Sequence, residues 1–271
     1  MSQIDGATIL ITGAGGGIGR QLALRLSDLG ARVVLWDVDA ERLTGVASEV
    51  EERSANRPSI AEVDVGDGES VRRAAQETKD AVGPVDILVN NAGVVSGRAL
   101  LELSDRQIAA TFAVNTLALF WTTRAFLPDM IRRGRGHIVT IASAAGLIGV
   151  SRLSDYAASK HAAVGFDESL RAELRRIAPA IATTVVCPSY IDTGMFAGAR
   201  TRFPRLLPIL EGRDVVERIV RAIRRDEPRV VMPPFLRALP LLRALPIRVF
   251  DRIADVLGVN DSMDEFTGRR T

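Results

Sequence analysis

The stretch Thr12-Gly-Ala-Gly-Gly-Gly-Ile-Gly19 decides how this chain folds. The apolar run Ala7–Ile11 precedes it, and a segment of helical period follows it. Glycines at a strand-to-helix turn let the backbone approach a pyrophosphate closely, and the helix N-terminus offers free N–H groups. An ordinary loop can also be rich in glycine, but the flanking strand and helix favour a dinucleotide cradle. The residues assigned to it are Gly13, Gly15, Gly17, Ile18 and Gly19.

Outward from this turn, short apolar runs alternate with longer segments of helical period. The expected strands are Ala7–Ile11, Arg32–Trp36, Ile60–Val63, Ile87–Val89, His137–Ile141, Thr183–Cys187 and Arg229–Met232. The expected helices lie near 18–29, 40–53, 68–82, 105–133, 156–178 and 213–226. Several runs are apolar on both faces, as in a parallel sheet covered by helices. This order predicts an α/β, Rossmann-type, doubly wound fold with a seven-stranded parallel sheet and helices on both faces.

We expect one domain over residues 1–271, because the core contains no internal repeat and no low-complexity linker. The catalytic core would span about 5–232, followed by an apolar C-terminal extension over 233–271.

Composition excludes several classes of protein. With 47% hydrophobic and 25% charged residues, the chain has the profile of a globular protein with a full core. A net charge of +2 without blocks of like charge gives no sign of a nucleic-acid partner. The single cysteine, Cys187, precludes an intramolecular disulfide and fits a cytoplasmic protein. We expect the N-terminus to form the first strand rather than a signal peptide, no apolar run to span a membrane, and no metal site.

Two acids follow strands where a nucleotide would lie. Asp37 closes the second strand 18 residues after Gly19. A carboxylate there can accept hydrogen bonds from the ribose diol and would repel a 2′-phosphate. Because the glycine turn contains no Arg or Lys, we expect NAD rather than NADP, although Asp37 could also be a solvated acid at a strand end. Asp64, with its neighbour Val65, is assigned to the adenine.

The fourth strand ends in Asn90-Asn91-Ala92-Gly93. A ligand crevice opens at the carboxyl ends of the strands in folds of this kind, so Asn91, Ala92 and Gly93 are cofactor candidates. A plain turn is the alternative, because Asn and Gly dominate turns.

Together these motifs, with Asn115, Ser143 and Tyr156-(x3)-Lys160, resemble the short-chain dehydrogenase/reductase family. The resemblance covers residues 5 to about 232 and implies an oxidoreductase that uses a nicotinamide cofactor. Tyr156 and Lys160 are four residues apart on one expected helix, so their side chains leave the same face. An ammonium beside the phenol would lower its pKa from about 10 and make it a usable acid or base. Lys160 is one of only two lysines among 35 basic residues, which favours a specific need for an ammonium.

The resemblance assigns roles to further residues. Ser143 would orient the substrate oxygen, Asn115 would carry a water-mediated proton relay to Lys160, and Lys160 would hold the nicotinamide ribose. Both Tyr156 and Lys160 would therefore also touch the cofactor. The run Cys187–Thr193 matches the loop that grips the carboxamide, through Pro188, Ile191 and Thr193. Ser189 stands where relatives usually have glycine, which puts the local backbone angle in doubt.

Closer similarity, in Phe120–Pro128 and Gly136–Gly146, is to the retinol and 17β-hydroxysteroid dehydrogenase branch. That resemblance implies a lipophilic alcohol or carbonyl substrate, and relatives pair into homodimers or homotetramers through helices equivalent to 105–133 and 156–178. Two other functions remain open: an NAD-sensing or scaffold protein that kept the fold, and a dehydrogenase of a small polar alcohol.

The extension is apolar, arginine-punctuated and interrupted by prolines. Its prolines forbid one continuous helix, but a helix can begin at Pro246. That helix would place on one side the apolar residues Val249, Phe250, Ile253, Val256 and Leu257. Three interpretations remain open: packing on the core, a lid or subunit contact, and peripheral contact with a membrane.

Overall fold

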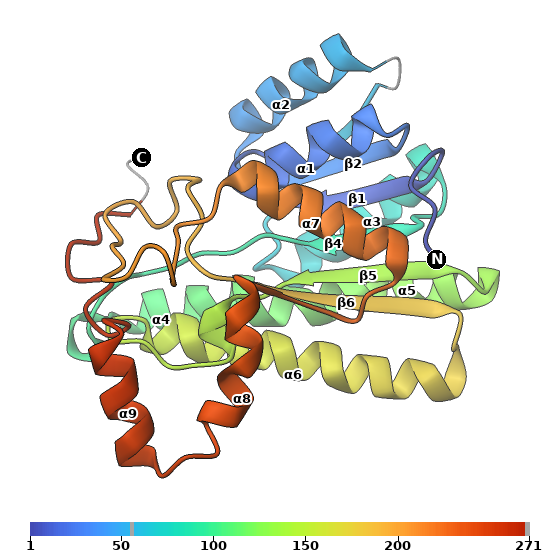
Figure 1. The fold of residues 1–271 in the computed structure, drawn as a ribbon. Coiled ribbons are helices and arrows are strands. Elements are labelled where there is room, and N and C mark those ends of the chain that lie inside the picture. Colours follow the sequence, from blue (N-terminus) through green and yellow to red (C-terminus); the bar gives the residue numbers. More distant parts are fainter. Residues whose placement is uncertain (55–56, 269–271) are drawn as a thin grey trace.

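Seven parallel strands form one sheet in the order β3-β2-β1-β4-β5-β6-β7 (Figure 1). The structure is a computed structural model that describes residues 1–54 and 57–268. The strands are β1 (Thr8–Thr12), β2 (Arg32–Asp37), β3 (Ser59–Glu62), β4 (Ile87–Asn90), β5 (Gly136–Ile141), β6 (Ile181–Pro188) and β7 (Arg229–Met232). The order reverses between β1 and β4, and a ligand crevice opens at such a switch point. The predicted fold class is confirmed.

Helices cover both faces of the sheet. They are α1 (Gly17–Asp28), α2 (Ala40–Arg53), α3 (Gly68–Val82), α4 (Asp105–Phe112), α5 (Ala118–Arg133), α6 (Ser154–Ile177) and α7 (Gly212–Arg225). Successive residues of β1 point to opposite faces, so Ile9 packs in the layer of α1, α2 and α7, whereas Leu10 packs in the layer of α3, α5 and α6. Both side chains are fully buried, which explains why the strand shows no polar alternation.

The expected continuous helix over 105–133 is wrong in one respect. A π-helical turn, Ala113–Leu117, separates α4 from α5. Within this turn the Asn115 side chain accepts a hydrogen bond from the Val94 N–H at 2.8 Å and donates to the Val94 carbonyl at 2.9 Å. Single π turns of this kind are frequent at functional sites. The widened turn therefore serves a tertiary contact that helical periodicity does not reveal.

The extension begins after β7 and projects from one end of the molecule (Figure 1). It forms α8 (Leu239–Leu242) and α9 (Ile247–Val256), so the helix predicted to begin at Pro246 is confirmed. Residues 259–268, here called the C-terminal strap, then fold back onto the loop after β6. Arg200 N–H donates to the Ser262 carbonyl at 2.9 Å, and Thr267 N–H donates to the Ala197 carbonyl at 2.9 Å. Residues 269–271 of the predicted extension lie outside the described residues.

Within residues 1–54 and 57–268, every helix is too short or too polar to span a bilayer.

Candidate active site

A cleft of about 460 Å³ lies at the carboxyl ends of β1, β2, β4 and β5. It brings together almost all residues predicted to bind the cofactor. Those that line it are Gly13, Gly15, Gly17, Ile18, Asp37, Asp64, Val65, Asn91, Ala92, Gly93, Tyr156, Lys160, Pro188, Ile191 and Thr193. Gly19 stands behind this lining rather than within it.

The glycine turn has the shape of an anion cradle. Gly13 and Gly17 have φ of 65° and 55°, in the left-handed region that favours glycine. A Cβ atom on Gly13 would lie 2.8 Å from Cα of Ala92, and one on Gly19 would clash with the Gly13 carbonyl oxygen. Helix α1 begins at Gly17 without a capping side chain and without an acid in its first turn. Its first N–H groups are therefore open to a pyrophosphate in the cleft.

Asn91 braces this turn from β4. Its side-chain Nδ2 donates to the carbonyls of Thr12 at 2.9 Å and Gly13 at 3.1 Å. In return, the Thr12 hydroxyl accepts the N–H groups of Asn91 at 3.0 Å and Ala92 at 3.1 Å. The Asn91 side chain thus fixes the cradle, and the residue borders the cleft mainly through its backbone.

Asp37 lies beside the cradle, as predicted. Its Oδ2 accepts the Gly15 N–H at 2.7 Å, and its Oδ1 accepts the Asp39 N–H at 3.1 Å. Arg42 also lines the cleft, a cation that the sequence reasoning missed. It is paired with Asp39 at 3.0 Å, so the guanidinium is partly neutralised. Asp64 lies exposed farther along the cleft, where its Oδ1 accepts the Gly66 N–H at 2.8 Å.

Tyr156 and Lys160 are buried side by side on α6. Lys160 Nζ donates to the Ile141 carbonyl at 2.9 Å and lies 5.7 Å from the centre of the Tyr156 ring. Burial lowers the pKa of Lys160 to about 8. Burial raises the pKa of Tyr156, and a hydrogen bond with Ser143 only partly opposes this. The expected lowering of the Tyr156 pKa is therefore wrong for the protein alone, because desolvation of the phenolate dominates.

Ser143 stands two residues beyond β5, next to the Tyr156 hydroxyl. It precedes the 3-10 turn Ala144–Gly146, and its Oγ accepts the Ala145 N–H at 3.1 Å. Its hydroxyl also faces the Pro188 carbonyl at 3.4 Å. The serine is thus held from two sides at the point where the predicted substrate oxygen would lie.

Asn115 and Lys160 approach the same space beside Gly93. A Cβ atom on Gly93 would lie 3.3 Å from Oδ1 of Asn115 and 3.5 Å from Nζ of Lys160. Asn115 Nδ2 also donates to Ser159 Oγ at 3.0 Å, which donates to the Tyr156 carbonyl at 2.7 Å. A side chain at position 93 would therefore enter the space between Asn115 and Lys160, where the predicted relay would run.

Two supporting groups escaped the sequence reasoning. Buried Asp155, next to Tyr156, accepts the hydroxyls of Ser96 and Thr111, each at 2.8 Å. The Phe196 ring meets the Tyr156 ring edge-on, with centroids 5.7 Å apart. In the sequence, Asp155 is recognisable only as an acid in the first turn of an expected helix. Its hydrogen-bond partners are 59 and 44 residues away in the chain, so the sequence does not reveal them.

Ser189 takes the place of the usual glycine without strain. Among the described residues, the non-glycine positions with positive φ are Arg152 and Asp226, so Ser189 is not in the left-handed region. Its N–H donates to the Met232 carbonyl at 2.8 Å, which ties this loop to β7.

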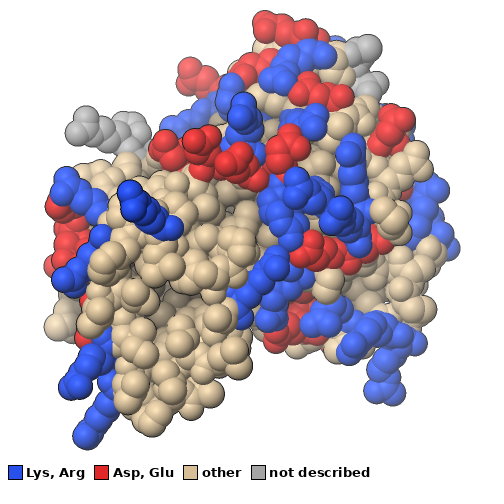
Figure 2. Space-filling model, viewed as in Figure 1, with Lys and Arg blue, Asp and Glu red and all other residues tan. Residues whose placement is uncertain are grey.

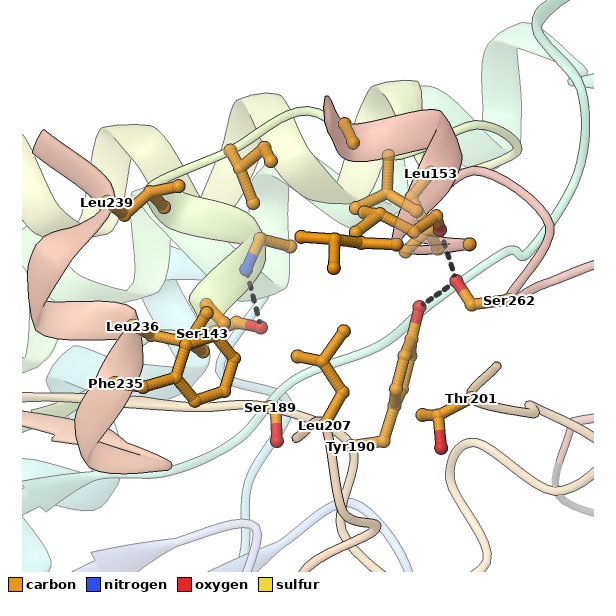
Figure 3. Close-up of a pocket in the computed structure, with 18 of the residues that line it drawn as sticks. Ser143, Leu153, Ser189, Tyr190, Thr201, Leu207, Phe235, Leu236, Leu239 and Ser262 are labelled. Carbon is orange, nitrogen blue, oxygen red and sulfur yellow. Dashed lines mark hydrogen bonds between the residues drawn. The ribbon is translucent and has the colours of Figure 1, made fainter. Parts of the chain in front are cut away.

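A second, apolar cavity of about 110 Å³ adjoins the cleft (Figure 3). Ser143, Tyr156, Ser189 and Phe196 line both spaces. Its walls include, from the extension, Phe235, Leu236, Leu239, Leu242, Phe250, Ile253, Ala254 and Leu257. On one side Tyr190 and Ser262 share a hydrogen bond of 2.7 Å between their hydroxyls. The inner side of the extension is therefore a wall of this cavity, which has room for an apolar group of several carbon atoms.

Neither the buried histidine nor the cysteine belongs to this site. His137 binds the hydroxyls of Ser2 at 2.9 Å and Thr184 at 2.8 Å at the opposite end of the sheet. Burial raises the pKa of Cys187 to about 12, which makes it a poor nucleophile. Over the described ranges, 1–54 and 57–268, no cluster of three or more His, Cys, Asp or Glu could hold a metal ion.

Comparison with known proteins gives consistent matches. The family model described as short chain dehydrogenase matches residues 7–202. Epidermal retinol dehydrogenase 2 of Mus musculus is 45% identical over 269 residues, covering 98% of this chain and 87% of the relative. Retinol dehydrogenase 10 of Xenopus tropicalis is 40% identical over 295 residues, covering 98% and 86%.

Solved structures match as well. A short chain dehydrogenase/reductase from Burkholderia phymatum in complex with NAD superposes with a TM-score of 0.82 at 30% identity, covering 92% of this chain and 96% of that one. A metagenomic short-chain oxidoreductase in complex with NADP gives a TM-score of 0.71 at 30% identity, covering 85% and 96%.

Proposed function

Because the chain belongs to the short-chain dehydrogenase family, and is an NAD(P)-dependent enzyme, we propose that it interconverts a lipophilic alcohol and its carbonyl compound with NAD. One observation carries the proposal: the apolar cavity meets the cofactor cleft at Ser143 and Tyr156. A substrate whose oxygen contacts these two hydroxyls would have its carbon chain in the apolar cavity. The similarity to proteins named retinol dehydrogenases supports the same substrate class.

The nicotinamide, when bound, supplies the hydride acceptor for oxidation and the hydride donor for reduction. In oxidation, deprotonated Tyr156 takes the hydroxyl proton of the alcohol as hydride leaves its carbon; in reduction, the phenol returns that proton to the new alkoxide oxygen. Ser143 donates a hydrogen bond to the same oxygen and stabilises its developing negative charge. Because burial raises the pKa of Tyr156, the residue has a stronger drive to take a proton than to release one. Positive charge on Lys160 would partly offset this in the oxidation direction.

NAD is the proposed cofactor because two carboxylates flank the site of a 2′-phosphate. Asp37 accepts the Gly15 N–H, and Asp39 pairs with Arg42, which lines this part of the cleft. A 2′-phosphate would meet Asp37 and would have to compete with Asp39 for the guanidinium. Solved relatives contain either cofactor, so the preference depends on these residues.

Two alternatives have weaker support. A protein that only senses NAD has no need of Tyr156, Ser143 and Asn115 around a second cavity. A dehydrogenase of small polar alcohols would be expected to offer more polar partners than the hydroxyls of Ser189, Tyr190, Thr201 and Ser262 in that cavity.

The test is the absorbance of reduced nicotinamide across a panel of primary and secondary alcohols of increasing chain length, retinol included. The proposal expects kcat/KM to rise with chain length and to be higher with NAD than with NADP. Turnover confined to short polar alcohols would identify the polar-substrate alternative. Tight NAD binding with no turnover on any alcohol would identify the sensor.

We also propose that the protein forms a homo-oligomer through α5 and α6. Leu117, just before α5, and Phe120, on α5, are exposed, and Phe120 meets Phe166 of α6 with ring centroids 4.8 Å apart. Leu119 and Phe126, on the same helix, are buried in the core and cannot contribute. A monomer by light scattering at micromolar concentration would contradict this proposal.

A further inference from the structure

The outer side of the α8–α9 hairpin exposes a cluster of large apolar side chains. Figure 2 shows the corresponding lobe as a largely uncharged surface with basic side chains beside it. The cluster, here called the hairpin tip, consists of Leu241 (77% exposed), Leu245 (39%), Ile247 (75%), Val249 (46%) and Val256 (59%). These five residues lie within 16 positions of one another in a hairpin that projects from the body (Figure 1). Soluble proteins rarely leave many large apolar side chains gathered on one projecting segment in water.

The hairpin tip is distinct from the side of the hairpin that serves the active site. Leu239, Phe250, Ile253 and Leu257 point inward and line the apolar cavity. Helix α9 thus has an inner apolar stripe that is covered and an outer apolar margin, including Val249 and Val256, that is not. The sequence placed Val249, Val256 and Phe250 on one side, but the structure divides that side between the cavity and solvent. Packing against the protein core explains the inner stripe and leaves the hairpin tip without a partner among residues 1–54 and 57–268.

The charges around the hairpin tip are mostly positive. Between residues 237 and 256 the chain has Arg237, Arg243, Arg248 and Arg252, all exposed, against the two acids Asp251 and Asp255. Arg237 lies 4.0 Å from Glu227, and Arg243 donates to the Leu147 carbonyl at 2.8 Å. Arg248 and Arg252 form no ion pair with any residue that the structure describes. An apolar tip bordered by unpaired arginines fits a surface that is apolar below and anionic above.

We propose that the hairpin tip docks into the surface of a membrane that contains anionic lipids. Leu241, Ile247 and their neighbours would enter the boundary between headgroups and acyl chains, while the arginines contact lipid phosphates and carboxylates. A second copy of the chain is the competing occupant. A two-fold pairing of this face on itself would bring arginines against arginines, so charge favours the lipid. Docking would also place the outer wall of the apolar cavity at the lipid, where oily alcohols are dissolved.

The proposal is tested by sedimentation of the full-length protein with vesicles. The vesicles contain phosphatidylcholine alone or phosphatidylcholine with phosphatidylserine. Wild type is expected to sediment with the anionic vesicles, and added salt should weaken its binding. Ile247→Ser with Val249→Ser should reduce the bound fraction about tenfold, and Arg248→Glu with Arg252→Glu should remove the preference for phosphatidylserine.

Matched controls separate docking from folding and from catalysis. Ile177→Ser changes an equally exposed apolar residue at the end of α6 and should bind vesicles as wild type does. All of these variants should keep wild-type thermal stability and wild-type turnover of a water-soluble alcohol without vesicles, because none of the changed residues lines either cavity. Tyr156→Phe should still bind vesicles, so failure of the proposed chemistry would leave the docking result standing.

Three outcomes would overturn the proposal. The first is that wild type stays in the supernatant with both vesicle types. The second is that Ile177→Ser loses vesicle binding as strongly as the variant with Ile247→Ser and Val249→Ser. The third is that wild type does not bind vesicles and is a dimer in light scattering, which the variant with Ile247→Ser and Val249→Ser dissociates. The last result would assign the hairpin tip to a second copy of the chain.

Discussion

Asp37 is the residue on which the choice between NAD and NADP depends in our account. Asp37→Asn keeps an acceptor for the Gly15 N–H and removes the negative charge. Repulsion of a 2′-phosphate should fall, so the ratio of kcat/KM with NADP to that with NAD should rise about tenfold or more. Asp64→Asn, a second acid in the same cleft, is the control and should leave the ratio unchanged. A wild-type enzyme that turns over faster with NADP would contradict the role given to Asp37.

A second residue-scale prediction concerns pH. Asp167 on α6 is fully buried, its Oδ1 has no hydrogen-bond partner among the described residues, and Thr183 Oγ1 lies 3.5 Å from its Oδ2. Burial raises the pKa of Asp167 from 3.8 to about 7, while Arg171 acts in the opposite direction. The folded state therefore holds this proton more tightly than the unfolded state. Its stabilising contribution is complete below the unfolded pKa and is lost as pH rises through the folded pKa.

Asp167→Asn removes this titration with little change in shape. The free energy of unfolding of the variant, relative to wild type, should increase by up to about 4 kcal/mol between about pH 4 and pH 7 and then level off. Urea unfolding at several pH values measures this difference. A difference that stays constant across that range would show that Asp167 does not titrate as described.

At the scale of elements, the turn from β1 into α1 fixes the cofactor cradle. Gly19 lies in the first turns of α1, where an added Cβ would clash with the Gly13 carbonyl, a backbone atom that cannot move aside easily. Gly19→Ala should weaken NAD binding at least about tenfold, because the cradle must open to admit the methyl group. Gly45→Ala is the control: it lies in α2 with open space around it and should be neutral or stabilising by about 0.5–1 kcal/mol. Calorimetric NAD titration and thermal unfolding of both variants provide the measurement, and equal NAD affinities would argue against the close packing at Gly19.

The elements differ in how far their sequence predicts them. Apolar runs between turns were sufficient to predict all seven strands, because buried parallel strands need apolar residues on both faces. Strand β3 spans Ser59–Glu62 rather than the predicted Ile60–Val63, one residue off at each end, although the Val63 N–H still donates to the Asp37 carbonyl of β2 at 2.7 Å. The π turn at Ala113–Leu117 was not predictable, because it serves a contact between Asn115 and Val94, which are 21 residues apart in the chain.

In the candidate site, too, some features were predictable from the sequence and others depend on the folded chain. Most residues around the cleft were predictable, because they close a strand or open a helix at the same edge of the sheet. The direction of the Tyr156 pKa was not, because it depends on how completely the folded chain excludes water from the hydroxyl. Asp155, Phe196 and Arg42 were missed because only the folded chain brings them to the site.

At the scale of the whole molecule, the extension forms a wall of the apolar cavity, and we propose that it thereby selects the substrate. Phe250 and Val256 lie on the same helix, but Phe250 lines the cavity and Val256 is exposed. Phe250→Ala should lower kcat/KM for long-chain alcohols about tenfold, because it removes apolar contact with the chain, and should leave NAD affinity unchanged. Val256→Ala should leave both quantities at the wild-type value. Equal substrate profiles for Phe250→Ala and wild type would show that the extension has no part in substrate selection.

The most direct test of the central claim is the turnover of Tyr156→Phe with a long-chain alcohol and NAD. This variant removes one oxygen atom from the point where the two cavities meet and leaves the apolar ring and the glycine cradle in place. The account predicts that kcat falls by about 10²-fold or more, since proton transfer from the alcohol is lost, while the dissociation constant of NAD changes less than about twofold. Turnover close to wild type would contradict the claim that Tyr156 moves the proton in this reaction.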